Sequence, residues 1–290
     1  MVLSLTRSIR DTLSMIRFSH SVFALPFALL ALFLAADGWP SAHVLLWVLV
    51  AMVAARSAAM GMNRLADRRL DAANPRTENR ELVTGALSVR FVAAFTAVCA
   101  LVFVLAAWQL NAVALALSPV VLLVLFGYSF LKRFTALAHF GVGLALGLSP
   151  LGAWIAVRGS DWGDLRTPLA LGAGVLLWVT GFDVIYACQD ADVDRELGLH
   201  SLPARLGVRR ALHVAAVLHV LCAAAFAAVA PLAGLGWLYL GAVGLAAALL
   251  IVEHAIVSPT DLSRVNAAFF TVNGVVALIL GAAGIVDVLG

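Results

Sequence analysis

The sequence predicts an all-α membrane protein with nine transmembrane helices. Of the 290 residues, 63% are hydrophobic and only 12% are charged, and the mean hydropathy is +1.02. Soluble domains are about half apolar and about a quarter charged. The apolar residues also gather in runs of about 16 to 23, the length that crosses a hydrocarbon core about 30 Å thick. These observations exclude a soluble domain.

The nine spans follow from the boundaries of the apolar runs. We expect them near residues 22–36, 42–63, 88–108, 111–129, 135–157, 168–188, 210–230, 234–252 and 265–286. Residues 5–20 (LTRSIRDTLSMIRFSH) precede the first run and are expected to form an amphipathic helix in the membrane interface. A signal peptide is the alternative for this start. A retained first span is favoured because the segment recurs later in the chain.

The basic residues predict the orientation in the membrane. Of the 19 lysines and arginines, all but Arg56, Arg158 and Arg166 fall on one side, which leaves sixteen there. Basic residues accumulate on the cytoplasmic side of membrane proteins. The prediction is therefore a cytoplasmic N-terminus, an outward C-terminus and a bacterial-type inner membrane location. Because these arginines also explain the sequence pI of about 9.1, we expect no nucleic-acid partner.

The chain also carries a weak internal repeat. IRFSH at 16–20 resembles KRFTALAH at 132–139, and an acidic cluster follows in each half. We expect one domain over 1–290, with parallel four-helix pseudo-repeats at about 12–131 and 132–254 and a ninth helix at about 265–286. Such a repeat would bring the two acidic clusters face to face at one cytoplasmic cavity.

The first cluster is Asn63, Asp67 and Asp71, at spacing i, i+4, i+8. On a helix, these positions share one face. The alternative for a charged run is a solvated surface of ion pairs. Acidic side chains that recur on one face at the end of a membrane span are costly and usually functional.

The second cluster has the spacing i, i+3, i+7, i+11, which again predicts one helical face. It consists of Asp183, Tyr186, Asp190 and Asp194. Carboxylates this close repel one another unless a cation lies between them. Hard oxygen ligands at this density suit Mg²⁺, which binds through carboxylates together with substrate phosphates.

Basic residues near both clusters favour an anionic substrate. Lys132 and Arg133 lie on a neighbouring loop, and the arginines that interleave with the first cluster are Arg64, Arg68, Arg76 and Arg80. Arg56 precedes Asn63 by seven residues, on the same face and about 10 Å deeper. It is predicted to meet an anionic substrate group at the cavity floor, the alternative being a structural arginine that snorkels or pairs with a backbone carbonyl.

Several smaller residues receive structural roles. Cys99, Cys188 and Cys222 lie in apolar runs without metal-ligand or disulfide spacing, so we interpret them as small core residues. Small residues let membrane helices approach closely. Four glycines are expected to act in this way: Gly127, Gly141, Gly143 and Gly147. His20 and His139 are interpreted as interfacial hydrogen-bonding residues.

These motifs resemble those of the UbiA superfamily of intramembrane prenyltransferases, and the resemblance covers essentially the whole chain. The first family motif, NxxxDxxxD, is matched by NRLADRRLD at 63–71, followed by NPRTENREL. The second, DxxYAxxDxxxD, is matched by DVIYACQDADVD at 183–194, which continues into HSLPARLG. HSVFALPFALLA, YSFLKRFTALAHF and LGLSPLGAW are also similar to family segments.

The resemblance implies nine helices around a cavity, a Mg²⁺ cofactor, and transfer of a prenyl group from a polyprenyl diphosphate to an aromatic acceptor. The implied metal ligands are Asn63, Asp67, Asp71, Asp190 and Asp194. Asp183 would join them or orient the acceptor, and Lys132 and Arg133 would bind diphosphate. Tyr128 and Tyr186 would line the cavity near the developing cation. The prenyl tail would leave between helices into the lipid.

One position departs from the family pattern and leaves the acceptor open. Many 4-hydroxybenzoate enzymes of the family begin the first motif with Asn-Asp, whereas this chain has Asn63-Arg64. The resemblance therefore implies prenylation of an aromatic carboxylic acid for ubiquinone or menaquinone synthesis. It leaves 4-hydroxybenzoate and 1,4-dihydroxy-6-naphthoate of the futalosine route as alternative acceptors. Arg56 and Arg64 are candidates for binding these substrates.

Two further functions remain as alternatives. A transporter also combines parallel repeats with membrane-embedded charge, although its site is usually near the midplane. Other family branches act in haem O, chlorophyll or archaeal lipid synthesis. A requirement for Mg²⁺ and an isoprenoid diphosphate distinguishes a prenyltransferase from a transporter. Prenyl length and oligomeric state are not predicted.

Overall fold

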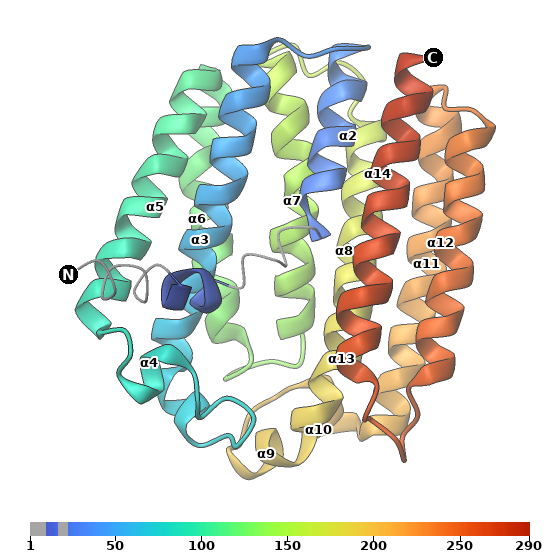
Figure 1. The fold of residues 1–290 in the computed structure, drawn as a ribbon. Coiled ribbons are helices and arrows are strands. Elements are labelled where there is room, and N and C mark those ends of the chain that lie inside the picture. The colour runs from blue at the N-terminus through green and yellow to red at the C-terminus, as the bar shows by residue number, and fades with distance from the viewer. Residues whose placement is uncertain (1–9, 17–22) are drawn as a thin grey trace.

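The computed structural model describes residues 10–16 and 23–290. Within them, helices make up all of the regular structure except for one isolated bridge between Ser258 and Asp261. The long helices are α2 (Leu25–Ala36), α3 (Ala42–Ala72), α5 (Val89–Leu110), α6 (Ala112–Leu131), α7 (Ala138–Arg158), α8 (Arg166–Ala187), α11 (Val208–Ala233), α12 (Trp237–Ile256) and α14 (Asn273–Leu289). They stand side by side as one bundle (Figure 1).

Eight described helices are long and apolar enough to cross a membrane. Each of the nine predicted spans coincides with a helix, but α2 has only 12 residues, fewer than the about 20 that a span needs. Residue 22, where the first span was expected to begin, lies outside the described part. The fold class is thus confirmed, whereas the count of nine full spans and the membrane orientation remain predictions.

Polar residues determine where several helices begin. The hydroxyl oxygens of Ser41 and Ser88 accept hydrogen bonds from backbone N–H groups in the first turns of α3 and α5, at 3.3 and 3.1 Å. The Asn111 side chain caps α6 in the same way at 2.9 Å. It also donates to the carbonyl of Ile155 on α7 at 2.9 Å. These contacts satisfy N–H groups that would otherwise lack partners at a helix end.

The lead-in segment is helical where the structure describes it, and its place in the membrane interface stays a prediction. Residues 10–15 are helical, while 1–9 and 17–22, including His20, lie outside the described residues. Met15 and Ile16 are buried against Leu82 and Leu87, in a cluster that also includes Val92. The described part of the lead-in therefore packs on the segment that joins α3 to α5, because its apolar side chains are buried against the apolar side chains of that segment.

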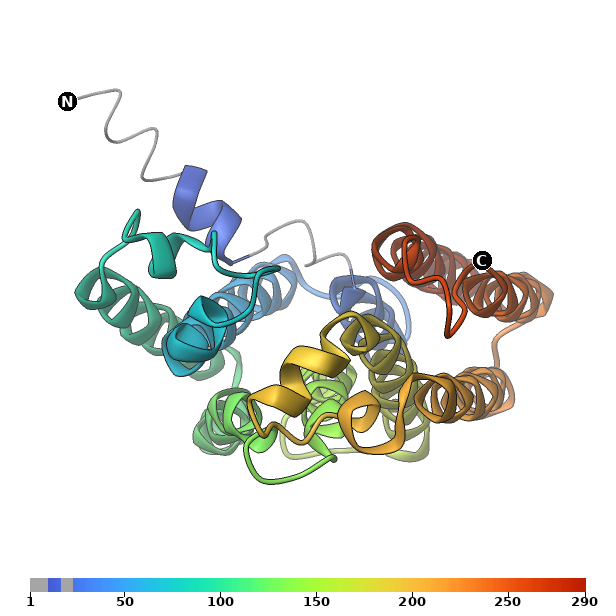
Figure 2. The same cartoon turned by 90° about the horizontal axis from the view of Figure 1, so that it is seen from below.

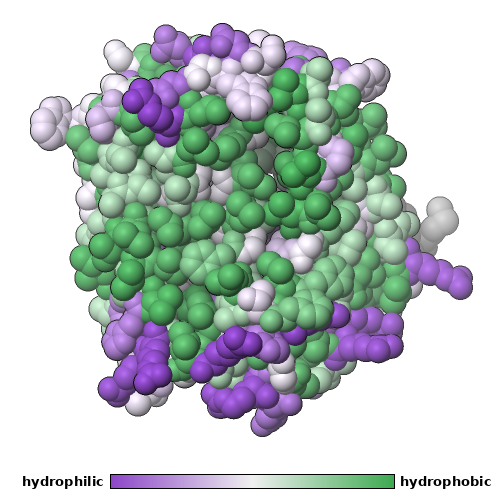
Figure 3. All heavy atoms as spheres, turned by 180° about the vertical axis from the view of Figure 1, so that it is seen from behind, coloured by the Kyte–Doolittle hydropathy of each residue, from purple (hydrophilic) through white to green (hydrophobic). Residues whose placement is uncertain are grey.

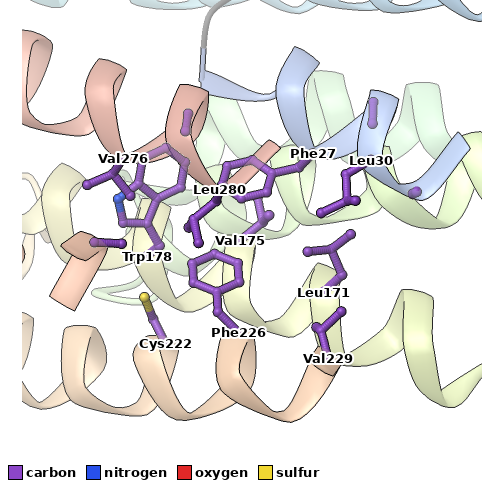
Figure 4. Packing of buried hydrophobic residues seen from close by; sticks show 14 of the residues in the cluster. Phe27, Leu30, Leu171, Val175, Trp178, Cys222, Phe226, Val229, Val276 and Leu280 are labelled. Carbon is purple, nitrogen blue, oxygen red and sulfur yellow. The ribbon is translucent and has the colours of Figure 1, made fainter. Parts of the chain in front are cut away.

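The core is centred on α8, which packs against α7 on one side and α11 on the other. Phe27 of α2 stacks on Phe226 of α11 with ring centroids 5.3 Å apart, and Trp178 of α8 lies beside both helices (Figure 4). The indole N–H of Trp178 donates to the side-chain oxygen of Asn273 at 2.6 Å. Asn273 in turn donates to Glu253 at 2.7 Å, which gives the buried polar groups partners within the apolar core.

Close helix crossings depend on glycine, as predicted for three of four positions. A Cβ at Gly147 of α7 would lie 2.8 Å from the carbonyl oxygen of Gly172 on α8, and Gly141 and Gly143 would also clash with neighbours. Gly127 faces open space, so its predicted packing role is wrong. Of the three cysteines, Cys188 and Cys222 are buried and Cys99 is half-buried.

The polar segments gather at one end of the bundle. Short helices α4 (Glu81–Thr84), η2 (Cys188–Asp190), α9 (Ala191–Glu196) and α10 (Leu202–Leu206) lie at the lower end in Figure 1. From below, residues 191–206 lie across the bundle end (Figure 2). On the face shown in Figure 3, an apolar band lies between polar rims. At this end the chain also forms α13 (Val265–Ala267) and the π-helical turn η3 (Ala268–Val272), which lead into α14.

Candidate active site

A polar cavity of about 190 Å³ lies at this end of the bundle. It brings together both sequence motifs, which are more than a hundred residues apart in the chain. Its polar lining consists of Asn63, Asp67, Asp71, Asn74, Arg76, Thr77, Arg80, Lys132, Asp190 and Asp194. Leu70, Leu197 and Leu199 complete the wall. The expected meeting of the two acidic clusters is therefore observed.

The first motif lies on the last turns of α3. The predicted span ended at residue 63, but the helix continues to Ala72, because the motif has helical spacing and few helix-breaking residues. Asp67 and Asp71 are buried. Lys132 donates to Oδ2 of Asp67 at 2.7 Å, and Arg80 donates to Oδ1 of Asp71 at 2.7 Å. Each carboxylate therefore has a cationic partner.

The second motif does not lie on one continuous helix. Asp183 and Tyr186 belong to α8, which tightens into the 3₁₀ turn η2 at Cys188–Asp190 before α9 begins at Ala191. Asp190 and Asp194 line the polar cavity, whereas Asp183 is not part of its wall. The turn separates the motif into two parts, because a 3₁₀ helix has fewer residues per turn than an α-helix.

A loop between α3 and α4 connects the two motifs. Arg76 donates from Nε to Oδ1 of Asp190 at 2.8 Å and from Nη2 to Oδ2 at 2.5 Å. It also donates to the hydroxyl of Tyr186 at 2.9 Å, and its guanidinium lies 5.0 Å from the centre of the Tyr186 ring. Asn74 donates to Oδ1 of Asp190 at 2.9 Å. The loop thereby holds the end of α8 next to the end of α3.

The charge state of Arg76 is well determined by these contacts. Burial by itself lowers the pKa of Arg76, but the hydrogen bonds to Asp190 and the nearby negative charges of Asp190 and Asp71 outweigh it and raise the pKa. A bidentate guanidinium–carboxylate pair is among the strongest ion pairs in proteins. Arg76 is therefore a permanent cation in the cavity wall.

A second, apolar cavity of about 380 Å³ lies deeper in the bundle, between α3, α5, α6 and α7. Arg56 and Tyr128 are among its few polar lining residues. Met60 of α3 lines it too, one helical turn before Asn63 in the polar cavity. The two cavities therefore follow each other along the same helix, about 5 Å apart at their nearest α3 residues.

The remaining predicted residues lie beside these cavities. Arg133 contacts Asp67 at 3.6 Å, donates to the carbonyl of Ala66 and lies over the ring of Phe130. Arg64 is buried and donates to the side-chain oxygen of Asn63 at 3.4 Å. The charges of Arg56, Arg64 and Asp183 all act on Tyr128. We call these four residues the inner cluster; Arg56 and Tyr128 line the apolar cavity.

The oxygen atoms that line the polar cavity are of the type that binds a hard divalent cation. Four carboxylates and the amide of Asn63 surround one cavity, and Oδ1 of Asp67 is buried without a hydrogen bond. Oxygen ligands of this type suit Mg²⁺. In the described arrangement the acids Asp67, Asp71 and Asp190 contact basic side chains, and no three Asp, Glu, His or Cys residues among 10–16 and 23–290 are arranged as a metal site.

Two polar cavity residues were not assigned a role from the sequence: Asn74 and Thr77. They belong to the stretch NPRTENREL, which resembles a family segment, and that resemblance was the available signal. His139 was interpreted as interfacial, yet it is buried and lies 2.7 Å from Asp183. The sequence around a single histidine at the start of an apolar run does not indicate a partner as distant in the chain as Asp183.

Comparison with protein families gives one match that covers most of the chain. Residues 24–275 match the model described as the UbiA prenyltransferase family. This chain belongs to the UbiA prenyltransferase family. It is accordingly a membrane-embedded prenyltransferase, and the resemblance seen in its two aspartate motifs is confirmed.

A curated relative of this UbiA-family enzyme is similar over nearly its full length. The 4-hydroxybenzoate octaprenyltransferase of Nitrosomonas eutropha is 33% identical over 257 residues, which cover 86% of this chain and 85% of the relative.

Solved UbiA structures share the fold. The apo structure of a UbiA homologue from Aeropyrum pernix K1 has a TM-score of 0.84 and 36% identity, covering 93% of this chain and 98% of that one. The UbiA homologue from Archaeoglobus fulgidus, bound to DMAPP and Mg²⁺, has a TM-score of 0.72 at 18% identity, covering 96% and 99%.

Proposed function

We propose that this UbiA-family enzyme transfers a polyprenyl group from a polyprenyl diphosphate to the ring of an aromatic carboxylic acid of the 4-hydroxybenzoate type. The reaction requires Mg²⁺ and serves ubiquinone or menaquinone synthesis. One observation carries the proposal: a charged cavity and an apolar cavity adjoin along α3, which matches a donor with a charged head and an apolar tail. The name of the Nitrosomonas eutropha relative supports this acceptor class.

The diphosphate binds in the polar cavity, where Arg76, Arg80 and Lys132 provide positive charge. Arg133 lies beside this cavity and adds to the field. The residues that would hold Mg²⁺ are Asn63, Asp67, Asp71, Asp190 and Asp194. A solved UbiA homologue bound to DMAPP and Mg²⁺ supports the requirement for the metal. When bound, Mg²⁺ would stabilise the negative charge that develops on the departing diphosphate.

The reaction breaks the bond between the allylic carbon and the diphosphate oxygen. The aromatic faces of Tyr128 and Tyr186 stabilise positive charge on the allylic carbon. The apolar walls around Met60 exclude water, which would otherwise capture that carbon. A ring carbon next to the phenolic hydroxyl then forms the new carbon–carbon bond, and a base takes the proton from that carbon, which restores aromaticity.

The acceptor lies against the inner cluster. Arg56 binds its carboxylate, because this guanidinium lines the apolar cavity about 10 Å below Asn63. Asp183 faces the phenolic side of the acceptor and orients its hydroxyl group. The charges of both residues act on Tyr128, which supports a common binding place for the two ends of the acceptor.

The second acceptor candidate is 1,4-dihydroxy-6-naphthoate. The observation that favours it is Arg64, which stands in the first motif next to Asn63, is buried and adds a second guanidinium to the inner cluster. Both acceptors carry a carboxylate for Arg56. An assay that offers both acids to the purified enzyme with Mg²⁺ and a labelled prenyl diphosphate identifies the preferred one.

The aspartates provide the decisive test of the function. Asp67→Asn and Asp190→Asn are expected to reduce Mg²⁺-dependent prenyl transfer at least about a hundredfold, because charge stabilisation at the leaving group is lost. Product formation is measured with a labelled donor. Asp192→Asn is the matched control, since Asp192 belongs to the same segment, is 89% exposed and pairs with the exposed Arg195 at 2.8 Å. Retained transfer in the Asp67 and Asp190 variants would sink the assignment.

A further inference from the structure

His139 and Asp183 form a side-chain pair outside the polar cavity. Nδ1 of His139, at the start of α7, lies 2.7 Å from Oδ2 of Asp183 near the end of α8. The His139 side chain is 6% exposed and that of Asp183 is 26% exposed. The histidine is therefore enclosed by protein, whereas the carboxylate still reaches open space.

The second ring nitrogen of His139 has a partner that determines the tautomer. The backbone N–H of Leu202, in the first turn of α10, points to Nε2 at 3.3 Å. A backbone N–H can only donate, so Nε2 must accept with its lone pair. The ring proton consequently resides on Nδ1, from which it is donated to Asp183. Both nitrogens of a neutral imidazole are used.

This arrangement leaves one oxygen of Asp183 available. His139 holds Oδ2, and no hydrogen bond to Oδ1 is found among the residues that the structure describes. The charge of Asp183 acts on Tyr128 together with those of Arg56 and Arg64. Asp183 also lies one helical turn before Tyr186 on α8, and Tyr186 accepts a hydrogen bond from Arg76 of the polar-cavity wall at 2.9 Å. The available oxygen is therefore close to both the polar cavity and the inner cluster, where the proposed function locates the acceptor.

The segment that fixes the tautomer is itself held at the site. His200 donates its backbone N–H to the carbonyl of Lys132 at 2.8 Å, and Lys132 pairs with Asp67. Two residues later, Leu202 contacts His139. Residues 200–202 are therefore attached to the loop before α7 and to α7 itself, which connects the diphosphate side of the site to the Asp183 side.

We propose that His139 is a positioning residue that holds Asp183 in one orientation toward the phenolic hydroxyl of the acceptor, with its tautomer set by the backbone of Leu202. This inference rests on the proposed function for the identity of the acceptor. A fixed Oδ2 leaves Oδ1 to accept the hydrogen bond from the hydroxyl group. That hydrogen bond raises the electron density of the neighbouring ring carbon, which is the atom that attacks.

Two amide substitutions separate the two contacts of the ring. In His139→Asn the side-chain NH₂ replaces Nδ1 and can donate to Asp183, whereas the contact with Leu202 is lost. In His139→Gln the side-chain oxygen replaces Nε2 and can accept from Leu202, whereas the contact with Asp183 is lost. His139→Ala removes both. All three are compared with the wild type by steady-state kinetics on the full chain, with thermal unfolding as a check of folding.

We expect kcat/KM for 4-hydroxybenzoate to fall about tenfold to a hundredfold in His139→Gln and His139→Ala, the cost of about 1.5 to 3 kcal/mol for a hydrogen bond to a charged group. The loss of kcat/KM in His139→Asn is expected to be about tenfold smaller than the loss in His139→Gln. KM for the prenyl diphosphate should stay within about twofold in all three. The proposal would be overturned if kcat/KM fell equally in the Asn and Gln variants. It would also be overturned if the loss of kcat/KM in each variant merely matched the fall in its melting temperature.

The tautomer gives a measurement that does not depend on substrate. In ¹⁵N-histidine NMR of the full chain in detergent, with His139→Asn to assign the signal, the expected form has its proton on Nδ1. A proton on Nε2 would overturn the inference even if prenyl transfer is normal. If the wild type transfers no prenyl group to either aromatic acid, the proposed function fails, and the acceptor role of Asp183 fails with it.

Discussion

At the residue scale, Asp190 shows how the site is assembled. Its two carboxylate oxygens receive hydrogen bonds from Arg76 and Asn74, and Arg76 also donates to the hydroxyl of Tyr186. The two donors come from the loop after α3, whereas Asp190 and Tyr186 come from the other half of the chain. One guanidinium therefore joins both motifs, and the spacing within either motif alone does not reveal it.

Arg76 is accordingly expected to matter for the donor. Arg76→Ala removes a permanent cation from the cavity wall and leaves Asp190 without its bidentate partner. Hydrogen bonds to charged groups contribute about 1.5 to 3 kcal/mol, so kcat/KM for the prenyl diphosphate should fall about tenfold to a hundredfold. The measurement is initial rate against donor concentration.

The control for Arg76 is Arg195→Ala. Arg195 is also an arginine of the same bundle end, but it is 56% exposed and pairs with the exposed Asp192. An exposed ion pair contributes little, so activity should be close to that of the wild type. Equal losses in the two variants would indicate a general effect of surface charge and contradict the specific role of Arg76.

At the element scale, the crossing of α7 and α8 determines where the two motifs meet. α7 begins near the loop of Lys132, and α8 ends at Ala187, directly before the turn that carries Asp190, so the distance between the two helices sets the width of the site. Gly147 and Gly172 face each other at this crossing. A Cβ on Gly147 would lie 2.8 Å from the carbonyl oxygen of Gly172, and a Cβ on Gly172 would lie 2.7 Å from that of Gly147. Backbone atoms cannot move aside as a flexible side chain can.

Gly147→Ala should therefore destabilise the fold. Overpacking at a close contact costs about 1 to 3 kcal/mol, and we expect a lower melting temperature in detergent. Gly152→Ala is the matched control in the same helix, because a Cβ there has no atom within 4 Å. The Gly152 variant should be as stable as the wild type, since alanine also favours the helix. A normal melting temperature for Gly147→Ala would refute this role of the crossing.

At the scale of the whole molecule, the two ends of the bundle differ in their chemistry. The polar cavity and the basic loops lie at one end, and an apolar band separates it from the other end (Figure 3). The excess of lysine and arginine at the end with the cavity predicts that this end faces the cytoplasm. In that orientation the charged substrates reach the site from the side on which they are made.

Cysteine labelling tests this orientation directly. Ser160→Cys and Ser263→Cys introduce one exposed thiol each, at the end opposite the cavity and at the end with the cavity, in a chain whose three native cysteines are replaced. A membrane-impermeant maleimide added to intact spheroplasts should label only the Ser160 variant, and after the membrane is opened it should label both. Labelling of only the Ser263 variant in intact spheroplasts would reverse the predicted topology.

Much of the fold could be predicted from local pattern. The apolar runs predicted all nine long helices. A membrane span requires a certain length and hydropathy, and both can be read from consecutive residues in the sequence. The helical spacing of Asn63, Asp67 and Asp71 likewise predicted their shared face, since one α-helix fixes the relative direction of these side chains. The 3₁₀ turn at Cys188–Asp190 was not predicted, because the spacing of the second motif indicated one continuous helical face.

The sequence by itself determined the class of protein, the two oxygen-rich motifs and the basic residues that surround them. Only the tertiary structure decided which cation pairs with which carboxylate: Arg76 with Asp190, Arg80 with Asp71, Lys132 with Asp67. It also decided that His139 meets Asp183 and the backbone of Leu202. The physical reason is that hydropathy and helical period act between near neighbours, whereas ion pairs and hydrogen bonds form between whichever residues the packing of helices brings within about 3 Å.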